Sequence, residues 1–336
     1  MDHAEQTSVV AAAIAGDESA FSTLAERYRR ELHVHCYRML ASFDDAEDVV
    51  QETFLRAWRN RATFQARASF RAWLYRIATN ACLDFIARDA KRGVAESPDD
   101  APRLTSEISW LQPYPDRMLQ ELASTGAEPD VALVKKETIE LAFLAAIQLL
   151  TPNARAVLIL RDVLDWSAKE TADLLATSIA SVNSALQRAR ATLKKHVPAS
   201  APEWAPGVDA NEAERALLKR YMDATEQADT DAFIEMLRED ARFSMPPETG
   251  LYVGREVIVQ SWVDGGFGSE SFGQMRGVAI RANLQPAVAV YVRRPGTSEF
   301  RLFAMDVLRI VEGRIADITT FSGPLLVRAF DLPQTL

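Results

Sequence analysis

The sequence predicts a multidomain protein with two all-α domains followed by one α+β domain. Apolar residues recur at helical spacing through residues 8–95 and again through 137–196. Beyond residue 209, three helical stretches precede stretches with the strand pattern of alternating polarity. Segments rich in proline separate these blocks and mark them as domains. A chain of 336 residues is long enough for three domains.

Composition places the boundaries between these domains. The stretch 93–130 contains five prolines and mostly acidic charge, as is typical of a linker. Within it, Trp110, Leu111 and Tyr114 are expected to dock on a folded surface, with the C-terminal domain as the candidate. We expect domains at residues 1–95, 134–197 and 209–336, joined by linkers at 96–133 and 198–208.

The first domain is expected to open with two helices between residues 8 and 40. Gly16 can end the first helix, and Asp17 can cap the second. A third helix follows from about residue 44. At about 100° per residue its core stripe is Ala46, Val50, Thr53 and Ala57. The opposite stripe is acidic and amide-bearing, for solvent or a partner, and consists of Asp44, Asp48, Gln51 and Leu55.

The next helix of this domain has the opposite chemical character. Its predicted core stripe is Phe70, Leu74, Ile77, Ala81 and Phe85. Trp73, Arg76 and Asn80 share another face at i, i+3 and i+7. An indole beside a guanidinium and an amide can stack on bases and hydrogen-bond to them. An acidic docking helix and a basic, aromatic helix together suggest two partners, one of them nucleic acid.

The second all-α domain carries a helix-turn-helix pattern. Ser167 and Glu170 form a capping box at the start of a short helix, and a tight turn follows at 176–178. The second helix has a core stripe of Ile179, Val182, Leu186, Ala189 and Leu193. Its outer face presents small polar side chains and arginines that can reach phosphate or guanine, namely Ser181, Asn183, Ser184, Arg188 and Arg190.

These two domains resemble a known family. DDAEDVVQETFLRAW followed by SFRAWLYRIATNACLDF resembles region 2 of bacterial sigma factors of the extracytoplasmic-function type, and DWSAKETADLL with SVNSALQRARATL resembles region 4. The resemblance implies an alternative sigma factor that binds core RNA polymerase and initiates transcription at promoter DNA. In that family the acidic helix binds the polymerase clamp helices, region 4 meets the flap, and the linker threads toward the active-site channel.

The same resemblance assigns roles by position. It implies polymerase contacts at Asp44, Asp48, Gln51, Glu52 and Leu55. It implies minus-10 contacts at Trp73, Arg76 and Asn80. It implies minus-35 contacts at Ser181, Asn183, Ser184, Arg188 and Arg190.

The third domain has its own pattern. Helices are expected at 211–228, 231–237 and 255–263, and a strand is expected in ARFSMPP. Further strands are expected at 278–282, 287–293, 300–311 and 314–321. Leu284 occupies a hairpin position where Gly is usual, which leaves the turn register open.

YMDATEQADTDAFIEMLREDARFSMPP and YVGREVI resemble the SnoaL-like members of the nuclear-transport-factor-2 superfamily. That resemblance implies a cone-shaped α+β domain around a pocket, in a superfamily that includes polyketide cyclases and ketosteroid isomerases. The candidate pocket residues are Tyr221, Met245, Trp262 and Asp306. If it points inward, Asp306 would have a raised pKa and is a weak candidate base. Otherwise it pairs with Arg281 or Arg301, or faces solvent.

Net charge, cysteine content and hydropathy exclude some classes of function. The net charge of −9 argues against nonspecific coating of nucleic acid, yet Thr53–Arg92 carries nine Arg/Lys against two Asp. Cys36 and Cys82 lie in apolar helices and are expected to be free buried thiols of a reducing cytoplasm. Without a signal peptide or an apolar run of membrane length, we expect a cytoplasmic protein with no membrane partner. No metal site or cofactor is expected.

The leading interpretation is a sigma factor, not an enzyme, whose SnoaL-like domain is an internal regulatory surface. Two alternatives remain open: a DNA-tethered cyclase or isomerase, and a ligand-responsive repressor that never binds polymerase. The acidic helix favours the sigma factor, because a repressor needs no polymerase dock. The enzyme would require an inward Asp306 with a second polar group beside it. An unidentified small ligand for the pocket also remains open.

Overall fold

The computed structural model describes residues 3–64, 69–89, 108–124, 138–196, 212–248 and 250–336. The chain divides into two compact units. The first, called the helical unit, contains residues 1–102, 120–134 and 146–196. The second, called the sheet unit, contains residues 103–119, 135–145 and 197–336, so parts of the predicted 96–133 linker and the start of the predicted second domain belong to it. The predicted 198–208 linker lies outside the described residues.

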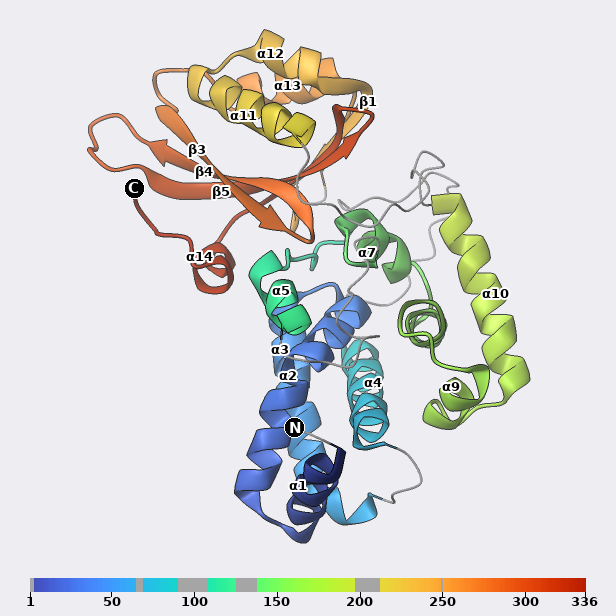
Figure 1. The fold of residues 1–336 in the computed structure, drawn as a ribbon. Coiled ribbons are helices and arrows are strands. Elements are labelled where there is room, and N and C mark those ends of the chain that lie inside the picture. The colour runs from blue at the N-terminus through green and yellow to red at the C-terminus, as the bar shows by residue number, and fades with distance from the viewer. Residues whose placement is uncertain (1–2, 65–68, 90–107, 125–137, 197–211, 249) are drawn as a thin grey trace. The chain divides into compact units, whose positions relative to one another are not determined.

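The helical unit opens with the predicted helices. They are α1 (His3–Ala15), α2 (Glu18–Leu40), α3 (Phe43–Arg59), the short 3-10 helix η1 (Arg61–Thr63) and α4 (Phe70–Arg88) (Figure 1). Gly16 adopts φ +103°, which favours glycine, and ends α1. Asp17 then accepts hydrogen bonds from the amides of Ser19 and Ala20 as the N-cap of α2. The predicted helix break is therefore confirmed.

The predicted core stripe is correct for α3 but is displaced on α4. Ala46, Val50, Thr53 and Ala57 are all buried on α3, as predicted. On α4 the stripe is displaced, because Ile77 and Phe85 are only half-buried. The buried positions of α4 are Phe70, Leu74, Tyr75, Ala78, Thr79, Ala81, Cys82 and Ile86. This rotation follows from the packing of α4 against both α2 and α3, which widens its buried face.

The remaining helices of this unit include the helix-turn-helix, which consists of α9 (Ala168–Leu174) and α10 (Ile179–His196). These two helices are preceded by α7 (Leu141–Gln148), α8 (Pro152–Leu158) and the π-helix η5 (Ile159–Val163). Ser167 and Glu170 form the predicted capping box, with both reciprocal hydrogen bonds present. The prediction was wrong for Ile179, which is 48% exposed at the first turn of α10.

The sheet unit contains the α+β domain. It has α11 (Glu212–Gln227), α12 (Thr230–Met236), β1 (Leu237–Ser244), β2 (Leu251–Val253), α13 (Arg255–Asp264), β3 (Gln274–Ala282), β4 (Gln285–Arg293), β5 (Arg301–Val311), β6 (Arg314–Phe321) and α14 (Pro324–Phe330). The strand order is β2-β1-β6-β5-β4-β3, with β1 parallel to β6 and the other pairs antiparallel. The predicted meander is confirmed, while β2 and α14 were missed.

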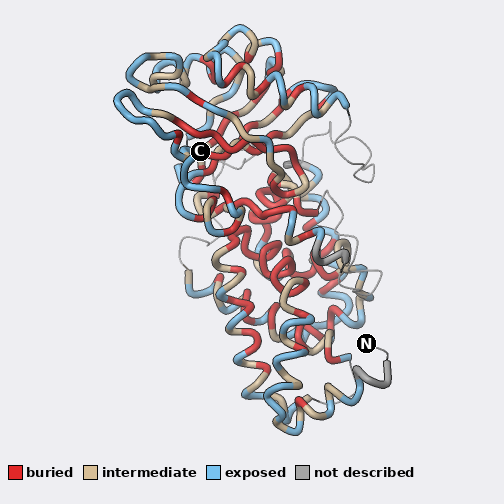
Figure 2. Tube along the Cα trace, turned by 60° about the vertical axis from the view of Figure 1, so that its left-hand side comes forward, coloured by how far each residue is buried: buried red, intermediate tan, exposed pale blue. Residues whose placement is uncertain are grey.

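A core fills the space between the helices and the sheet. Figure 1 shows α11, α12 and α13 along one face of the sheet and α14 on the other side. Tyr221, Phe233, Phe243 and Leu308 belong to one buried apolar cluster, and buried residues appear in red in Figure 2. β4 is buried from Gln285 to Val292. A strand covered on both faces reads as a continuous apolar run, which matches its sequence.

The β3–β4 turn resolves the register that the sequence left open. Asn283 and Leu284 form a two-residue turn with φ +56° and +57°. Positive φ at both central residues is the geometry of a type I′ hairpin. Leucine is unfavourable there, so surrounding contacts must hold this turn in place.

Candidate nucleic-acid and ligand sites

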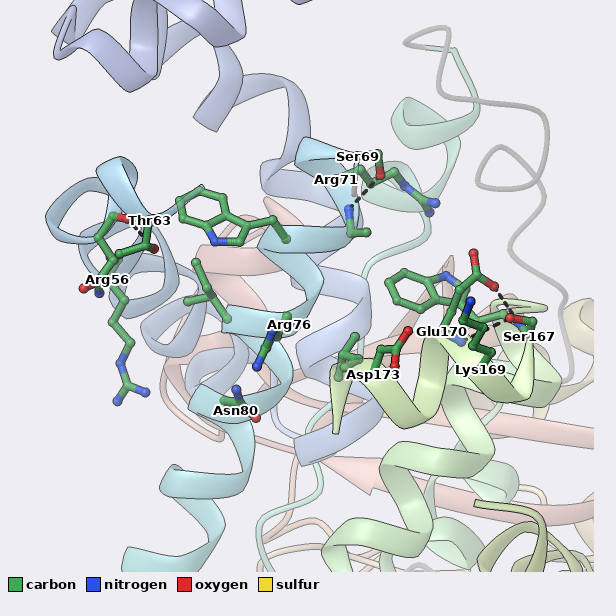
Figure 3. A pocket seen from close by; sticks show the side chains of 16 residues that line it. Arg56, Thr63, Ser69, Arg71, Arg76, Asn80, Ser167, Lys169, Glu170 and Asp173 are labelled. Carbon is green, nitrogen blue, oxygen red and sulfur yellow. Dashed lines mark hydrogen bonds between the residues drawn. The ribbon is translucent and has the colours of Figure 1, made fainter. Parts of the chain in front are cut away.

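A groove of about 1340 Å³ lies within the helical unit between α4 and the start of α9. Trp73, Arg76 and Asn80 line it from α4, and Lys169 and Asp173 line it from α9 (Figure 3). The three α4 residues that the sequence assigned to one face therefore share one groove. Trp73 is half-buried and packs edge-on against Phe64 at 5.5 Å between ring centroids. Arg76 and Asn80 are exposed.

The cations of this groove divide into paired and solvent-exposed groups. Arg56 donates to Glu52 at 2.7 Å and to Asp84 at 2.6 Å. Arg71 donates to the buried Glu31 at 3.0 Å. Both guanidiniums are therefore engaged in holding helices together. Arg76 and Lys169 are exposed, which suits contact with a phosphate or base.

The outer face of α10 is exposed as its stripe predicts. Ser181, Asn183, Ser184 and Arg188 are exposed, while Val182 and Leu186 are buried. Arg190 is also exposed, but two of its three guanidinium nitrogens donate to Asp162, at 2.9 and 2.7 Å. Arg190 would have to leave this ion pair to contact DNA. Because an exposed pair contributes at most about 1 kcal/mol, that exchange is inexpensive.

The predicted docking face of α3 is accessible along most of its length. Asp48 and Gln51 are exposed and Leu55 is 51% exposed, whereas Asp44 and Glu52 are half-buried. Glu52 accepts a hydrogen bond from Arg56, so it is partly committed within the helix. The exposed Leu55 therefore shares its helix face with the Asp48 carboxylate and the Gln51 amide.

A second candidate site lies in the sheet unit, as a cavity of about 250 Å³ between the helices and the sheet. All four candidate pocket residues, Tyr221, Met245, Trp262 and Asp306, line it. The rings of Phe233, Phe243 and Phe267 line it too, with Phe233 edge-on to Trp262 at 5.1 Å. The cavity is therefore mainly apolar with one acidic group.

Asp306 lies in the cavity wall with two hydroxyl partners. Tyr221 donates its phenol proton to one carboxylate oxygen at 3.0 Å, and Thr320 donates to the other. Burial raises the pKa of Asp306, while the hydrogen bonds from Thr320 and Tyr221 lower it. Burial and the neighbouring charge of Asp306 raise the pKa of Tyr221 well above its usual value. The alternative partners are wrong, because Arg281 pairs with Asp116 and Glu214, and Arg301 lies 3.8 Å from Glu299.

The sheet unit also contains a network of polar contacts between the β3–β4 hairpin and residues 114–116, and the sequence did not predict these contacts. The Tyr114 amide donates to the Asn283 side chain at 2.8 Å, and the Asn283 amide donates to the Tyr114 carbonyl at 2.8 Å. Asp116 accepts from the Leu284 amide at 2.7 Å and from Arg281 at 3.1 Å. The docking of Tyr114 and Leu111, both buried, agrees with the expectation. Trp110 is half-buried.

A second segment, at the start of the predicted 134–197 domain, contacts the same hairpin. Asn283 donates its side-chain amide to the Ile139 carbonyl at 2.8 Å, and the Leu141 amide donates to the Gln285 side chain at 3.0 Å. Asn283 is 0% exposed and Gln285 is 4% exposed. We call segments 108–119 and 138–145 the docked segments, and Arg281–Gln285 the hairpin lock.

None of the described helices is long and apolar enough to cross a bilayer. The described part of the chain also contains no group of three or more His, Cys, Asp or Glu side chains placed to hold a metal ion.

Comparison with known proteins identifies the modules. Family models match Sigma-70 region 2 at residues 24–92, Sigma-70 region 4 at 140–193 and a SnoaL-like domain at 218–318. The helical sigma domains and the mixed-sheet domain predicted from the sequence are therefore confirmed.

Individual relatives cover most or all of these modules. The chain is 41% identical over 324 residues to the ECF RNA polymerase sigma factor SigG of Mycobacterium tuberculosis (strain ATCC 25618 / H37Rv), covering 94% of this chain and 85% of SigG. It is 30% identical over 185 residues to the ECF sigma factor SigW of Bacillus subtilis (strain 168), covering 54% of this chain and 91% of SigW. The crystal structure of the Mycobacterium tuberculosis extracytoplasmic function sigma factor SigJ shares the fold, with a TM-score of 0.59 and 19% identity over 92% of this chain and 98% of that chain. The chain belongs to the ECF RNA polymerase sigma factors and carries a fused SnoaL-like domain.

Proposed function

We propose that this sigma factor engages core polymerase through the exposed face of α3 and reads promoter DNA with α4 and α10. The observation that carries the proposal is the joint exposure of Asp48, Gln51 and Leu55, opposite a fully buried stripe on the same helix. The clamp helices are the expected target of α3 and the flap that of the helix-turn-helix. Its site of action is the cytoplasm, where core polymerase resides.

We assign minus-10 reading to the α4 face. Trp73 presents part of its indole to the groove, and Arg76 and Asn80 are exposed beside it. Base stacking on an indole contributes about 1–3 kcal/mol per base and tolerates any sequence, while the amide and guanidinium supply base-edge hydrogen bonds. This combination suits melted, single-stranded DNA.

We assign minus-35 reading to the outer face of α10. The small side chains of Ser181 and Ser184 permit close approach to the floor of the major groove. Arg188, one turn further along and exposed, can reach a guanine edge or a phosphate. Arg190 is the weaker candidate of the two because Asp162 holds it.

The docking assignment is tested by the double variant Asp48→Lys, Gln51→Ala. Both side chains are exposed and make no core contact, so far-UV circular dichroism should be unchanged while core polymerase binding is abolished. The measurement is a pull-down with purified core polymerase, followed by run-off transcription. The matched control Glu26→Lys, Arg27→Ala changes exposed residues of α2 and should bind normally. Unchanged core affinity in the α3 variant would refute the docking role.

Promoter reading is tested by comparing Arg188→Ala with Trp73→Ala in the holoenzyme. Loss of a base-edge contact at Arg188 should weaken binding to promoters with a minus-35 element by about 1–3 kcal/mol. Loss of the Trp73 indole should leave closed-complex binding intact and impair melting. Permanganate footprinting separates the two effects. A melted region of normal extent with Trp73→Ala would remove Trp73 from this role.

We further propose that the SnoaL-like domain regulates the sigma domains through the linker. The support is the hairpin lock, in which Asn283 and Gln285 bind backbone groups on both docked segments. Residues 108–119 lie within the linker that, in sigma factors, threads toward the polymerase active site, and residues 138–145 follow that linker. A domain that holds or releases these segments biases the population of polymerase-competent chains, and a few kcal/mol suffices for a full switch.

A further inference from the structure

The SnoaL-like cavity contains a carboxylate without a basic neighbour in its described wall. Asp306 is the one carboxylate among the lining residues, and that described lining contains no arginine, lysine or histidine. The polar groups nearest to it are the hydroxyls of Tyr221 and Thr320. Removing a carboxylate from water without a cation is unfavourable, so a bound cation would stabilise the ionised form of Asp306.

The carboxylate also retains hydrogen-bonding capacity. Each of its oxygens accepts one hydroxyl hydrogen bond, from Tyr221 or from Thr320. An ionised carboxylate offers about four lone-pair sites, so two remain. Because Asp306 lines the cavity and is half-buried, a molecule inside can donate to those remaining sites.

The rest of the wall also favours a cation. The rings of Phe233, Phe243 and Trp262 are interlocked edge to face, with centroid separations of 5.1 Å for Phe233–Trp262 and 5.4 Å for Phe243–Trp262. Aromatic faces carry negative potential and attract ammonium groups. Two other lining rings, Phe272 and Phe303, already have the Arg294 guanidinium at 4.7 and 5.9 Å from their centroids.

We propose that this cavity binds a small organic cation, namely an aromatic or alicyclic amine whose ammonium group donates to Asp306 and whose ring packs against Trp262 and Phe233. The volume of about 250 Å³ sets its size. A dry cavity of about 150 Å³ admits benzene, so this one has room for about ten non-hydrogen atoms. An anionic ligand of the same shape is excluded by charge.

One helix links this site to the linker. α11 carries Tyr221 in the cavity wall and Glu214 nearer its start. Glu214 accepts from Arg281 at 3.0 Å, and the same guanidinium donates to Asp116 of the docked segment at 3.1 Å. An amine bound to Asp306 beside Tyr221 therefore contacts a carboxylate that is hydrogen-bonded to the same helix that braces the hairpin lock. This coupling rests on the proposed regulatory role, whereas binding itself does not.

The test uses three probes of one shape and different charge on the full-length chain. Phenethylamine is cationic, 2-phenylethanol is neutral and phenylacetate is anionic at pH 7. Isothermal titration should give a dissociation constant for the amine at least tenfold below that of the alcohol, with the acid weakest. Equal or tighter binding of phenylacetate, or no binding of the amine at 10 mM, would overturn the inference. This ranking is obtained on the unmodified chain.

Two variants test whether Asp306 is responsible for the preference for the amine over the alcohol. Asp306→Asn keeps the size of the side chain and removes its charge, so amine affinity should fall at least tenfold while alcohol affinity changes less than twofold. Asp223→Asn removes an exposed carboxylate of α11 that pairs with Lys219 and should alter neither. Amine affinity unaffected by Asp306→Asn contradicts the assignment. No polymerase is present, so failure here is distinct from failure of the promoter assignments.

Discussion

Replacement of Arg155 by methionine is expected to lower the free energy of unfolding of the helical unit by about 3–5 kcal/mol. Arg155 is 2% exposed and its guanidinium donates to four carbonyl groups and the Gln148 side chain. Those carbonyls belong to Met39, Ile147, Gln148 and Leu150. Methionine fills the space but removes the guanidinium donors from these buried acceptors, and an acceptor that loses its donor carries the desolvation penalty. The Ile147 carbonyl still accepts from the Leu150 amide at 3.2 Å.

The Met39 carbonyl gives this arginine a second consequence. It lies near the end of α2, in the region 2 module, whereas Arg155 lies on α8 of the region 4 module; the hydrogen bond between them is 2.5 Å long. Arg155 therefore holds the two sigma modules together inside the helical unit. Arg155→Met should let them separate more readily as well as weaken the second module.

Chemical denaturation followed by tryptophan fluorescence measures this loss. Arg190→Met is the matched control, because Arg190 also makes two guanidinium hydrogen bonds in the same module but is exposed. Its loss should change stability by less than about 1 kcal/mol. Arg155→Lys should fall between, since lysine keeps the charge but lacks the planar fork. Equal effects at positions 155 and 190 would show that burial is not the cause.

Replacement of Asp116 by alanine is expected to weaken linker docking by about 2–4 kcal/mol. Asp116 is 5% exposed and bridges the Leu284 amide and Arg281. Its loss leaves the half-buried Leu284 amide without this acceptor, in a turn where Leu284 already holds an unfavourable positive φ. The docked segment 108–119 should then detach from Arg281–Gln285 far more often.

Hydrogen exchange of the full-length chain provides the measurement. Amide protection in segment 108–119 and at the hairpin should fall about 30- to 1,000-fold, the equivalent of that free energy. Run-off transcription should change in amount without a change in promoter preference. Glu299→Ala is the control, because it also removes a carboxylate of the sheet unit, but one that is exposed and lies 3.8 Å from Arg301. Unaltered exchange and transcription with Asp116→Ala would end the regulatory proposal.

The sequence predicted those features that depend on local periodicity. The buried stripe of α3, the Asp17 cap and the Ser167–Glu170 box all arise from residues within about one to three helical turns of each other. The sequence singled out Asp306 because an acidic residue in an apolar strand is unusual. The alternation of side chains along the strand did not determine whether Asp306 points into the cavity or toward solvent.

Features that depend on tertiary contacts were missed. Arg155 near the start of a helix resembles an ordinary solvent-exposed arginine, and only its packing against α2 makes it buried. Asn283 and Gln285 look like hairpin residues, yet their partners lie 169 and 144 positions away along the chain. No periodic pattern connects such positions. Leu284 was the local signal, since a leucine in a glycine position implies outside support.

The two docked segments give the linker a distinctive connectivity. Both 108–119 and 138–145 attach to the same hairpin lock, so the chain between them begins and ends at one point. A chain segment whose two ends are held at one place forms a closed loop. A segment that lies extended along a narrow channel has its two ends far apart. If the linker enters a polymerase channel, as the proposed function requires, at least one of the two attachments has to be undone before the chain between them can extend, and it has to re-form before the sigma factor can return to its starting state.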